Sequence, residues 1–339
     1  MAMDIEVGLD AAGLSYEAEE QITVDAARLG YARIWTGSLG DPFQTCALRW
    51  AATRHVVAGG IGTAIGVVPV GQRTPADLAQ SASALGRLTG GRFVLGIGAG
   101  NVYDSAYRRQ WGIEERSSLA LVRAYLTTIR GFFSGERVTH RGQGISYDGA
   151  ALPAVAPAPQ LYLGVVGPEM ARLGGELADG VYLSWCTPDN VQWIRTRVGE
   201  GAERAHRDPA DVKLAASVRV SIDEDREVAR RALAAALLPY VLGWDGTPPR
   251  AFVTHFERMG FANDVAGLQR MRRDGASHEQ IIDAFSDPMM QSLGYFGPAA
   301  GAFEAVRRQV AGADIAVVRI VAARPGVEAA RAVLAACRG

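Results

Sequence analysis

Apolar runs with the composition of β-strands alternate with helical segments along the whole chain, and this alternation limits the fold more than any other feature. The strand-like runs are 5–9, 33–35, 56–64, 93–97, 161–166, 180–183, 212–220 and 315–321. The intervening helical segments are 16–29, 42–53, 75–88, 117–133, 168–178, 189–206, 226–238 and 298–310. Eight strands that alternate with eight helices predict an α/β fold of the (β/α)8 TIM barrel type.

One helix-to-strand unit can be followed residue by residue. Thr74 is placed to cap a helix that starts at Pro75. Gly90 and Gly91 supply the positive φ that commonly ends a helix. The apolar run 93–97 that follows is continuous, which is typical of a strand covered on both faces, as in a parallel sheet.

Alternating glycines close that strand and indicate a place for a ligand. Gly96, Gly98 and Gly100 fall at its carboxyl end, where small residues let a ligand approach the backbone closely. They do not form a Rossmann fingerprint, because a third spaced glycine is missing and the strand is not the first of the chain.

The chain is expected to form one domain, 1–339, since no low-complexity linker divides its 339 residues. Three intervals are longer than ordinary loops: 102–116, 135–159 and 240–297. In a barrel, insertions after strands lie at the carboxyl-terminal face and shape the pocket. The longest has helical patterning of its own and is predicted to form a lid or a dimer surface.

Composition excludes several classes of partner. The 35 basic and 36 acidic residues nearly cancel and form no basic block, so we expect no nucleic acid partner. No apolar segment is long enough to span a bilayer, and Asp4 and Glu6 interrupt the amino terminus, which predicts neither a membrane anchor nor a signal peptide. Three widely spaced cysteines fit neither a disulfide framework nor a thiolate metal site, so a cytoplasmic setting is the simplest.

Two other barrel chemistries are less favoured. A Schiff-base aldolase would have to use Lys213, the only lysine. The five histidines form no paired metal-ligand motif, which leaves only carboxylate-bound magnesium open for a metal-dependent hydrolase.

Several motifs, taken together, resemble the bacterial-luciferase-like family. They are Asp41-Pro-Phe-Gln-Thr, Gly62-Thr-Ala-Ile, Arg73-Thr-Pro, the run 88–100 and the run 163–180. Within that family the chain is most similar to the deazaflavin (coenzyme F420) branch, which includes the methylenetetrahydromethanopterin reductases. The resemblance implies a barrel that binds a flavin or deazaflavin at the carboxyl ends of its strands, and a homodimer.

The resemblance also implies where the cofactor binds. The third strand of such proteins commonly has a bulge with a non-prolyl cis peptide behind the ring, at the place of Ala64–Ile65 here; an ordinary bend at 62–66 is the alternative. The predicted cofactor-binding residues are Thr63, Ala64, Ile65, Gly98, Ala99, Gly100, Asn101, Gly167, Pro168, Glu169 and Met170.

A phosphate site is predicted at Gly167–Pro168, because proline at the first helical position leaves free backbone donors at a helix N-terminus. A plain strand-to-helix turn is the alternative. Glu169 would repel a phosphate unless it points away. Arg108, Arg109 and Arg172 are candidate counter-charges.

The chain departs from the resembled pattern at its polar residues. The segment 35–41 lacks the Asp-His pair found in many deazaflavin-dependent relatives, and Asn101 stands where some have a carboxylate. An amide cannot act as a general acid at neutral pH. Asp10 and Asp41 are the candidate catalytic residues, although Asp41 also has the pattern of a helix cap. The predicted substrate pocket comprises Trp35, Ser38, Tyr103, Ser184 and Trp185, with core packing as the alternative for the tryptophans.

The resulting hypothesis is an oxidoreductase that transfers a hydride between coenzyme F420 and a C=C, C=N or C=O bond of a small organic substrate. One alternative is an FMN-dependent two-component monooxygenase that receives reduced flavin from a separate reductase. The other is a non-catalytic flavin-binding protein.

Overall fold

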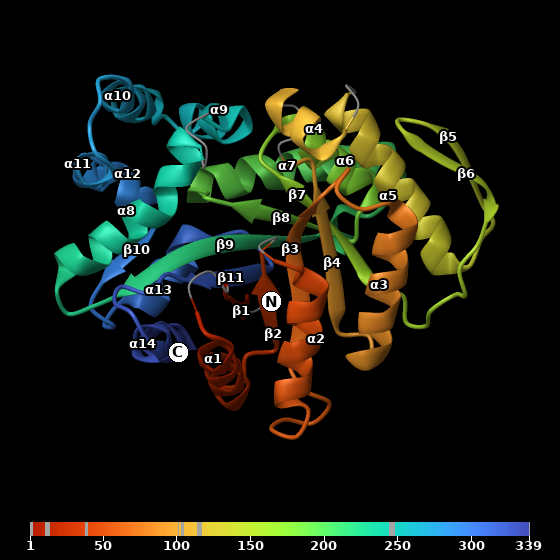
Figure 1. Ribbon diagram of the computed structural model, residues 1–339, viewed down its shortest axis with the longest axis horizontal. Helices are drawn as coiled ribbons and strands as arrows, with labels where there is room; N and C mark the ends of the chain where they lie inside the picture. The colour runs from red at the N-terminus through yellow and green to blue at the C-terminus, as the bar shows by residue number, and fades with distance from the viewer. Residues whose placement is uncertain are drawn as a thin grey trace.

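Eight parallel strands close into a barrel with helices around it, which confirms the predicted fold class (Figure 1). The computed structural model describes residues 3–10, 14–37, 40–100, 102, 105–113, 117–243 and 248–338. Around the ring the strands follow in the order β1, β2, β3, β4, β7, β8, β9 and β11, and β11 pairs with β1. Their bounds are β1 Asp4–Gly8, β2 Arg33–Thr36, β3 Gly62–Pro69, β4 Phe93–Gly98, β7 Gln160–Val165, β8 Gly180–Ser184, β9 Lys213–Ile222 and β11 Ile315–Ile320.

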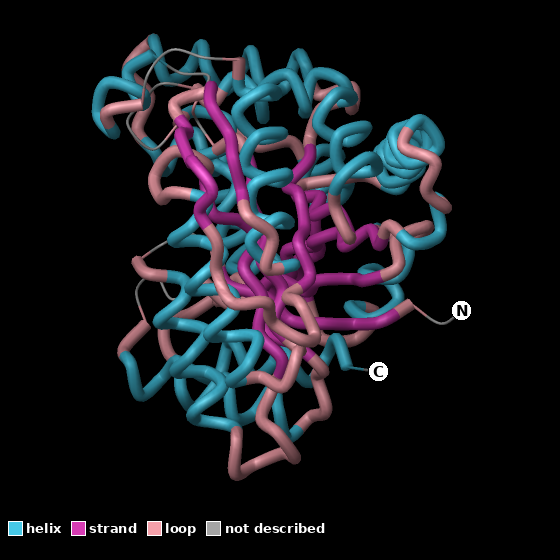
Figure 2. The backbone as a smooth tube through the Cα atoms, turned by 90° about the vertical axis from the view of Figure 1, so that its right-hand side faces the viewer, coloured by secondary structure: helices cyan, strands magenta, loops and turns pink. Residues whose placement is uncertain are grey.

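Helices surround the barrel between successive strands (Figure 2). Those nearest the predicted segments are α1 Tyr16–Arg28, α2 Pro42–Thr53, α3 Pro75–Leu88, α5 Ser118–Ser134, α6 Pro168–Leu177, α7 Pro188–Arg204, α8 Arg226–Leu242 and α13 Ala302–Gln309. The others are α4 Ser105–Trp111, η1 Pro209–Asp211, α9 Arg250–Arg258, α10 Ala262–Arg273, α11 His278–Asp283, α12 Asp287–Leu293 and α14 Val327–Arg338. The carboxyl-terminal helix α14 was not among the predicted elements.

The third strand is shorter than predicted at its start. Residues 56–59 form turns, and β3 begins only at Gly62. Gly59 and Gly60 have φ values of 75° and 76°, which end any extended run. The Trp50 indole fixes this turn by donating a hydrogen bond of 3.0 Å to the carbonyl of Gly59.

The unit around α3 forms as its sequence predicts. The Thr74 side chain accepts a hydrogen bond of 3.2 Å from the backbone N–H of Asp77, and Pro75 occupies the first helical turn. Gly90 and Gly91 follow the helix with φ values of 61° and 80°. Local capping rules therefore place α3 and β4 correctly.

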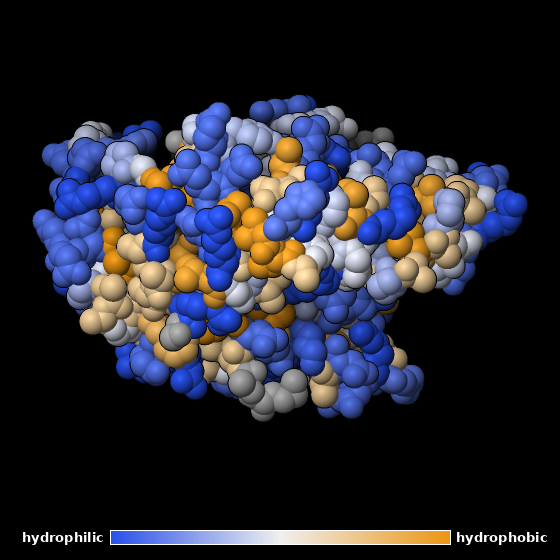
Figure 3. All heavy atoms as spheres, turned by 90° about the horizontal axis from the view of Figure 1, so that it is seen from below, coloured by the Kyte–Doolittle hydropathy of each residue, from blue (hydrophilic) through white to orange (hydrophobic). Residues whose placement is uncertain are grey.

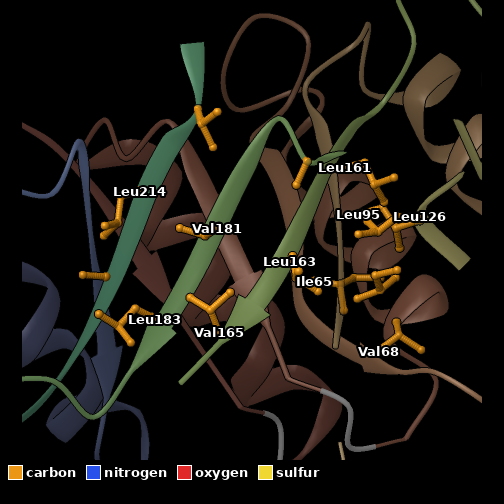
Figure 4. Packing of buried hydrophobic residues seen from close by; sticks show 14 of the residues in the cluster. Ile65, Val68, Leu95, Leu126, Leu161, Leu163, Val165, Val181, Leu183 and Leu214 are labelled. Carbon is orange, nitrogen blue, oxygen red and sulfur yellow. The ribbon is translucent and has the colours of Figure 1, made fainter. Parts of the chain in front are cut away.

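Side chains on the outer surface of the strands form the main core against the helices (Figure 4). Alternate residues of each strand point the same way, so this set is regular along β7, β8 and β9: Leu161, Leu163, Val165, Val181, Leu183 and Leu214. The face seen from below in Figure 3 intersperses hydrophilic and hydrophobic residues, as is normal for a folded surface. Within the described ranges, no helix is long and apolar enough to cross a membrane.

Inside the barrel the packing includes a polar pair. The carboxylate of Glu6 lies 2.6 Å from the Arg33 guanidinium and accepts a hydrogen bond from the Trp35 indole. The Trp35 ring stacks on Tyr182, with centroids 5.1 Å apart, and tilts against Tyr162. Burial raises the pKa of the Glu6 carboxyl above its usual value despite the neighbouring Arg33. We call these five residues the lower layer, since each of them precedes the last residue of its strand.

The long intervals contain secondary structure of their own. The first contains α4, directly after β4, and the second contains an antiparallel hairpin of β5 Val138–Gly142 and β6 Ile145–Ala150, between α5 and β7. The third contributes α9 to α12 and β10 Gly294–Gly297, which extends the sheet parallel to the carboxyl end of β9. It packs with α8 around a separate apolar cluster. This insertion and the hairpin lie on opposite sides of the barrel (Figure 1).

Candidate active site

The carboxyl ends of the barrel strands form the predicted mouth, and a bulge on β3 shapes its floor. The pairing of β3 with β4 is interrupted between Ile65 and Val68. The non-prolyl cis peptide lies in that interval, at Gly66–Val67, so its predicted placement at Ala64–Ile65 is wrong by two residues. Ala64 and Ile65 instead pair regularly with both neighbouring strands, which leaves the extra residue of the bulge to come after them.

The glycines predicted to admit a ligand first of all make room for this bulge. A Cβ atom on Gly98 would lie 2.8 Å from a methyl group of Val67, and one on Gly164 would lie 3.1 Å from the other. On Gly96 it would lie only 2.2 Å from the carbonyl oxygen of Ile65. The small residues of β4 and β7 therefore let β3 turn inward, and Gly66 and Val67 remain partly accessible at the mouth.

Several predicted cofactor residues have no free side chain to offer. Thr63, Ala64 and Ile65 are fully buried in the β3 ladder. Ala99 is half-buried. Gly100 is exposed, has a φ of 55° and lies close to Pro69. Asn101, Ser38 and Tyr103 lie outside the described residues.

The amino terminus of α6 is an open set of backbone donors at the same end of the barrel. Gly167 precedes the helix without any side-chain cap, Pro168 takes the first turn, and a Cβ atom built on Gly167 would meet nothing within 4 Å. Glu169 turns to Arg172 on its own helix, and Arg172 also bonds Glu200 at 2.7 Å. Glu169 is thus paired, and Arg172 is already engaged by two carboxylates.

A different arginine reaches this helix terminus. Arg258, from α9 of the long insertion, donates a hydrogen bond of 3.0 Å to the carbonyl of Val166, one residue before Gly167. The predicted counter-charge Arg108 donates to the carbonyl of Val102 at 3.1 Å, and Arg109 is exposed on α4. No local sequence pattern indicates Arg258, because it lies about 90 residues farther along the chain.

Asp10 lies at the end of β1, where it meets an arginine from β11. Its carboxylate pairs with Arg319 and accepts a hydrogen bond of 3.2 Å from the backbone N–H of Gly37. Burial raises the pKa of Asp10, but the hydrogen bond from Arg319 and the charges of Arg319, Arg219 and Arg49 together outweigh it, so the net pKa is below its usual value. Arg319 is only 5% exposed and also donates to the Tyr182 hydroxyl at 3.1 Å.

A second buried arginine stands beside it on the neighbouring strand. Arg219 of β9 is the register partner of Arg319 and is 6% exposed. It donates to the Ser184 hydroxyl at 2.9 Å and to the Tyr240 hydroxyl at 3.2 Å. Its guanidinium carbon lies 3.6 Å from the centroid of the Trp185 ring, a close cation–π contact.

Trp185 is held from behind by the long insertion. The residue is fully buried with a φ of 53°, and its carbonyl oxygen lies 2.8 Å from Nε2 of His255 on α9. Burial lowers the pKa of His255 to about 4, so the imidazole is neutral at physiological pH. Ser184 and Trp185 of the predicted pocket thus come together at Arg219, whereas Trp35 is enclosed in the lower layer.

Asp41 has the structural role that its sequence pattern indicates. Its carboxylate caps α2 by accepting from the backbone N–H groups of Phe43 and Gln44, at 3.0 and 3.4 Å. It also pairs with Arg73 at 2.6 Å. Burial raises the pKa of Asp41, but these bonds lower it below the usual value.

Two competing chemistries find no support in the described part of the chain. Lys213 lies at the amino end of β9, opposite the mouth, and its ammonium group is directed to the carbonyl of Ala210. No group of three or more histidine, cysteine or acidic residues there is arranged to hold a metal ion.

The comparisons with known proteins agree with this architecture. A 5,10-methylenetetrahydromethanopterin reductase from Methanolobus tindarius is 30% identical over 303 residues, which cover 88% of each chain. The structure of the coenzyme F420-dependent tetrahydromethanopterin reductase from Methanopyrus kandleri superimposes with a TM-score of 0.79 at 19% identity, covering 98% of both chains. A type II Baeyer–Villiger monooxygenase from Pseudomonas putida, in complex with FMN, has a TM-score of 0.65 at 17% identity, with coverage of 98% and 97%.

The family itself follows from a match along nearly the whole chain. The family described as luciferase-like monooxygenase matches residues 3–316, which include every barrel strand up to the start of β11. The protein is therefore a member of the luciferase-like monooxygenase family.

Proposed function

We propose that the protein is a coenzyme F420-dependent oxidoreductase that moves a hydride between the deazaflavin and a small organic substrate. The open amino terminus of α6 at the barrel mouth supports this proposal, because it offers an anchor for an anionic cofactor tail. The similarity to a methylenetetrahydromethanopterin reductase over 88% of both chains favours deazaflavin over FMN.

The residues at the mouth fit such a cofactor. Gly167 has open space around it, and the pairing of Glu169 with Arg172 removes the repulsion that a free carboxylate would cause. The backbone N–H groups of Glu169 and Met170, in the first turn of α6, would hold a phosphate, with Arg258 as a nearby positive charge. Gly66 and Val67 on the β3 bulge would support the flat ring.

When bound, the deazaflavin supplies the hydride chemistry. The protein contributes orientation, shielding from water by the long insertion, and charge at the mouth. Asp10 and Asp41 both have pKa values below the usual range, so at neutral pH both are ionised and neither carries a proton to donate. We assign Asp10 to orientation at the mouth and Asp41 to capping, which leaves a tyrosine hydroxyl or a water as the proton source.

A pair of substitutions at Gly167 tests the anchor. Gly167→Asp places a carboxylate at the cap position, where the backbone (φ −126°, ψ 163°) accepts it and the helix gains a cap. The same carboxylate repels an anionic cofactor tail. Gly167→Asn adds the same bulk and a similar cap without the charge, so it is the matched control.

The measurement is a calorimetric titration of each apo-protein with oxidised coenzyme F420 and, in parallel, with FMN. We expect the parent to bind coenzyme F420 selectively, and the affinity of the Gly167→Asp variant to fall at least tenfold below that of the Gly167→Asn variant. Selective binding of FMN by the parent would transfer the proposal to a two-component monooxygenase. Binding of neither by the folded protein would refute the proposed function, and equal affinities of the two variants would refute the anchor.

A further inference from the structure

The two arginines at the barrel mouth share a single carboxylate. Asp10 bonds Arg319 directly, whereas the described groups that Arg219 contacts are neutral: the hydroxyls of Ser184 and Tyr240 and the rings of Trp185 and Tyr240. Among the described residues, no carboxylate forms an ion pair with Arg219. Arginine keeps its charge in proteins, so the cluster retains one positive charge that the fold does not neutralise.

Burial makes that charge costly. Only 6% of the Arg219 surface is exposed to solvent. Its pKa is lowered, and burial is the largest cause. A buried cation without a counter-charge is strongly unfavourable. Such a group is retained where a ligand supplies the missing negative charge.

Unpartnered polar atoms surround the same guanidinium. The Trp185 indole nitrogen and the hydroxyls of Ser217 and Ser221 are buried and have no hydrogen-bond partner among the described residues. Ser217 and Ser221 flank Arg219 at two-residue spacing on β9, so all three side chains leave the same face of the strand. Ser217 is also the register partner of Ser184, which already bonds Arg219. Buried polar atoms are rarely left unpaired, and their grouping here points to a bound polar molecule.

We propose that Arg219 is the receptor for a carboxylate of the substrate, with Ser217 and the Trp185 indole as further hydrogen-bonding groups. This rests on the proposed function, because it names the class of substrate: a small organic acid whose C=C, C=N or C=O bond lies near its carboxylate.

The charge balance favours a carboxylate over a phosphate. A carboxylate has one negative charge and two coplanar oxygens, which match the single unneutralised charge and the planar fork of arginine. A phosphate monoester carries up to two negative charges at neutral pH. Asp10, whose side chain is 42% exposed at the same mouth, would repel the second of these.

A matched pair of probes tests the site. Crotonate and crotonamide have the same size and the same C=C bond, but only crotonate is charged. Their binding is measured by calorimetry, with the chain alone and loaded with coenzyme F420, and inorganic phosphate serves as a competitor. The variants are Arg219→Gln, Arg219→Lys and, as a control for total charge, Arg141→Gln, which alters an exposed ion pair on the hairpin.

We expect crotonate, but not crotonamide, to bind the parent and the Arg141→Gln variant. The Arg219→Gln variant should bind at least tenfold more weakly, and Arg219→Lys, which lacks the fork, should fall in between. Phosphate should compete poorly. Because the crotonate–crotonamide comparison uses the unaltered protein, it stands even where a variant at position 219 fails to fold.

Three results would overturn the proposal. They are equal affinities for crotonate and crotonamide, no binding of crotonate at any soluble concentration, or tighter binding of phosphate than of crotonate at the same site. Loss of coenzyme F420 affinity in the Arg219→Gln variant without any crotonate binding would assign Arg219 to the cofactor instead. If coenzyme F420 fails to bind the parent while crotonate binds through Arg219, the anion site stands and the proposed function fails.

Discussion

The barrel encloses guanidinium groups at two levels, and the two levels differ in how their charge is balanced. In the lower layer, Arg33 faces Glu6 at 2.6 Å, and the Trp35 indole completes the bonding of that carboxylate. At the mouth, Asp10 is the one described carboxylate that pairs with either Arg219 or Arg319, and it pairs with Arg319. The first level is satisfied by the protein itself, whereas the second is complete only with a ligand. The comparison separates polar groups that hold the fold together from polar groups that are available for function.

Removing one arginine from each level gives the largest expected difference. Arg33→Met leaves the buried Glu6 carboxylate without its counter-charge, and we expect a loss of about 3 kcal/mol in the free energy of unfolding. Arg219→Met removes a charge that the fold does not balance and keeps much of the side-chain volume, so we expect a loss below about 1 kcal/mol. Urea denaturation at pH 7 measures both values.

The pH dependence of the first variant provides an internal check. Without Arg33, Glu6 regains a neutral form as the pH falls, so part of the lost stability should return in mild acid. Equal losses for the two variants would abolish the distinction between the two levels.

His255 sharpens the comparison, because it connects the long insertion to the mouth and to no part of the lower layer. Burial lowers its pKa from the usual 6.5 to about 4. Between these two pH values the imidazole is protonated in the unfolded chain and neutral in the folded protein. The resulting stability is fully present above pH 6.5 and is lost as the pH falls toward 4. We expect about 2 kcal/mol less stability from this group at pH 5 than at pH 7.

The matched control for this effect is His255→Gln, which keeps a hydrogen-bond donor for the Trp185 carbonyl but does not titrate in this range. Urea midpoints of both proteins at pH 7 and pH 5 isolate the contribution of His255 from that of the carboxylates. Parallel pH profiles of the two proteins would show that His255 is accessible to protons in the folded state.

The sequence was sufficient for the barrel and insufficient for the mouth, for physical reasons. Strand and helix periodicity, Thr74 and the Gly90–Gly91 stop are local signals, and each of them predicted an element that the structure contains. The bulge on β3 was misplaced because its position depends on the glycines of β4 and β7, which lie on other strands.

The charged cluster at the mouth has a partial signal in the sequence. Arg219 and Arg319 each stand between apolar residues near the end of a strand, and because the strands of a parallel barrel are covered on both faces, an isolated charge there marks an unusual buried position. That signal would have identified both arginines. It would not have paired them with Tyr240 or His255, which come from the long insertion and reach the mouth only through the tertiary fold.

The smallest expected effect concerns a single hydroxyl group, and here a hydroxyl at the mouth is compared with one that is bonded within the fold. The Ser217 hydroxyl makes no hydrogen bond within the described chain, whereas the Thr53 hydroxyl donates to the carbonyl of Arg49 at 2.8 Å and accepts from the N–H of Ile61 at 2.9 Å. Ser217→Ala should therefore change the free energy of unfolding by less than about 0.5 kcal/mol, while Thr53→Val, which leaves Ile61 unpaired, should cost about 1 to 3 kcal/mol.

Crotonate binding should reverse that order, because it is expected to weaken in Ser217→Ala and to stay unchanged in Thr53→Val. A stability loss in Ser217→Ala as large as in Thr53→Val would mean that the serine has a structural partner after all. A substitution that leaves the free energy of unfolding unchanged and still weakens ligand binding is what we expect at a binding site whose surrounding fold is stable without the ligand.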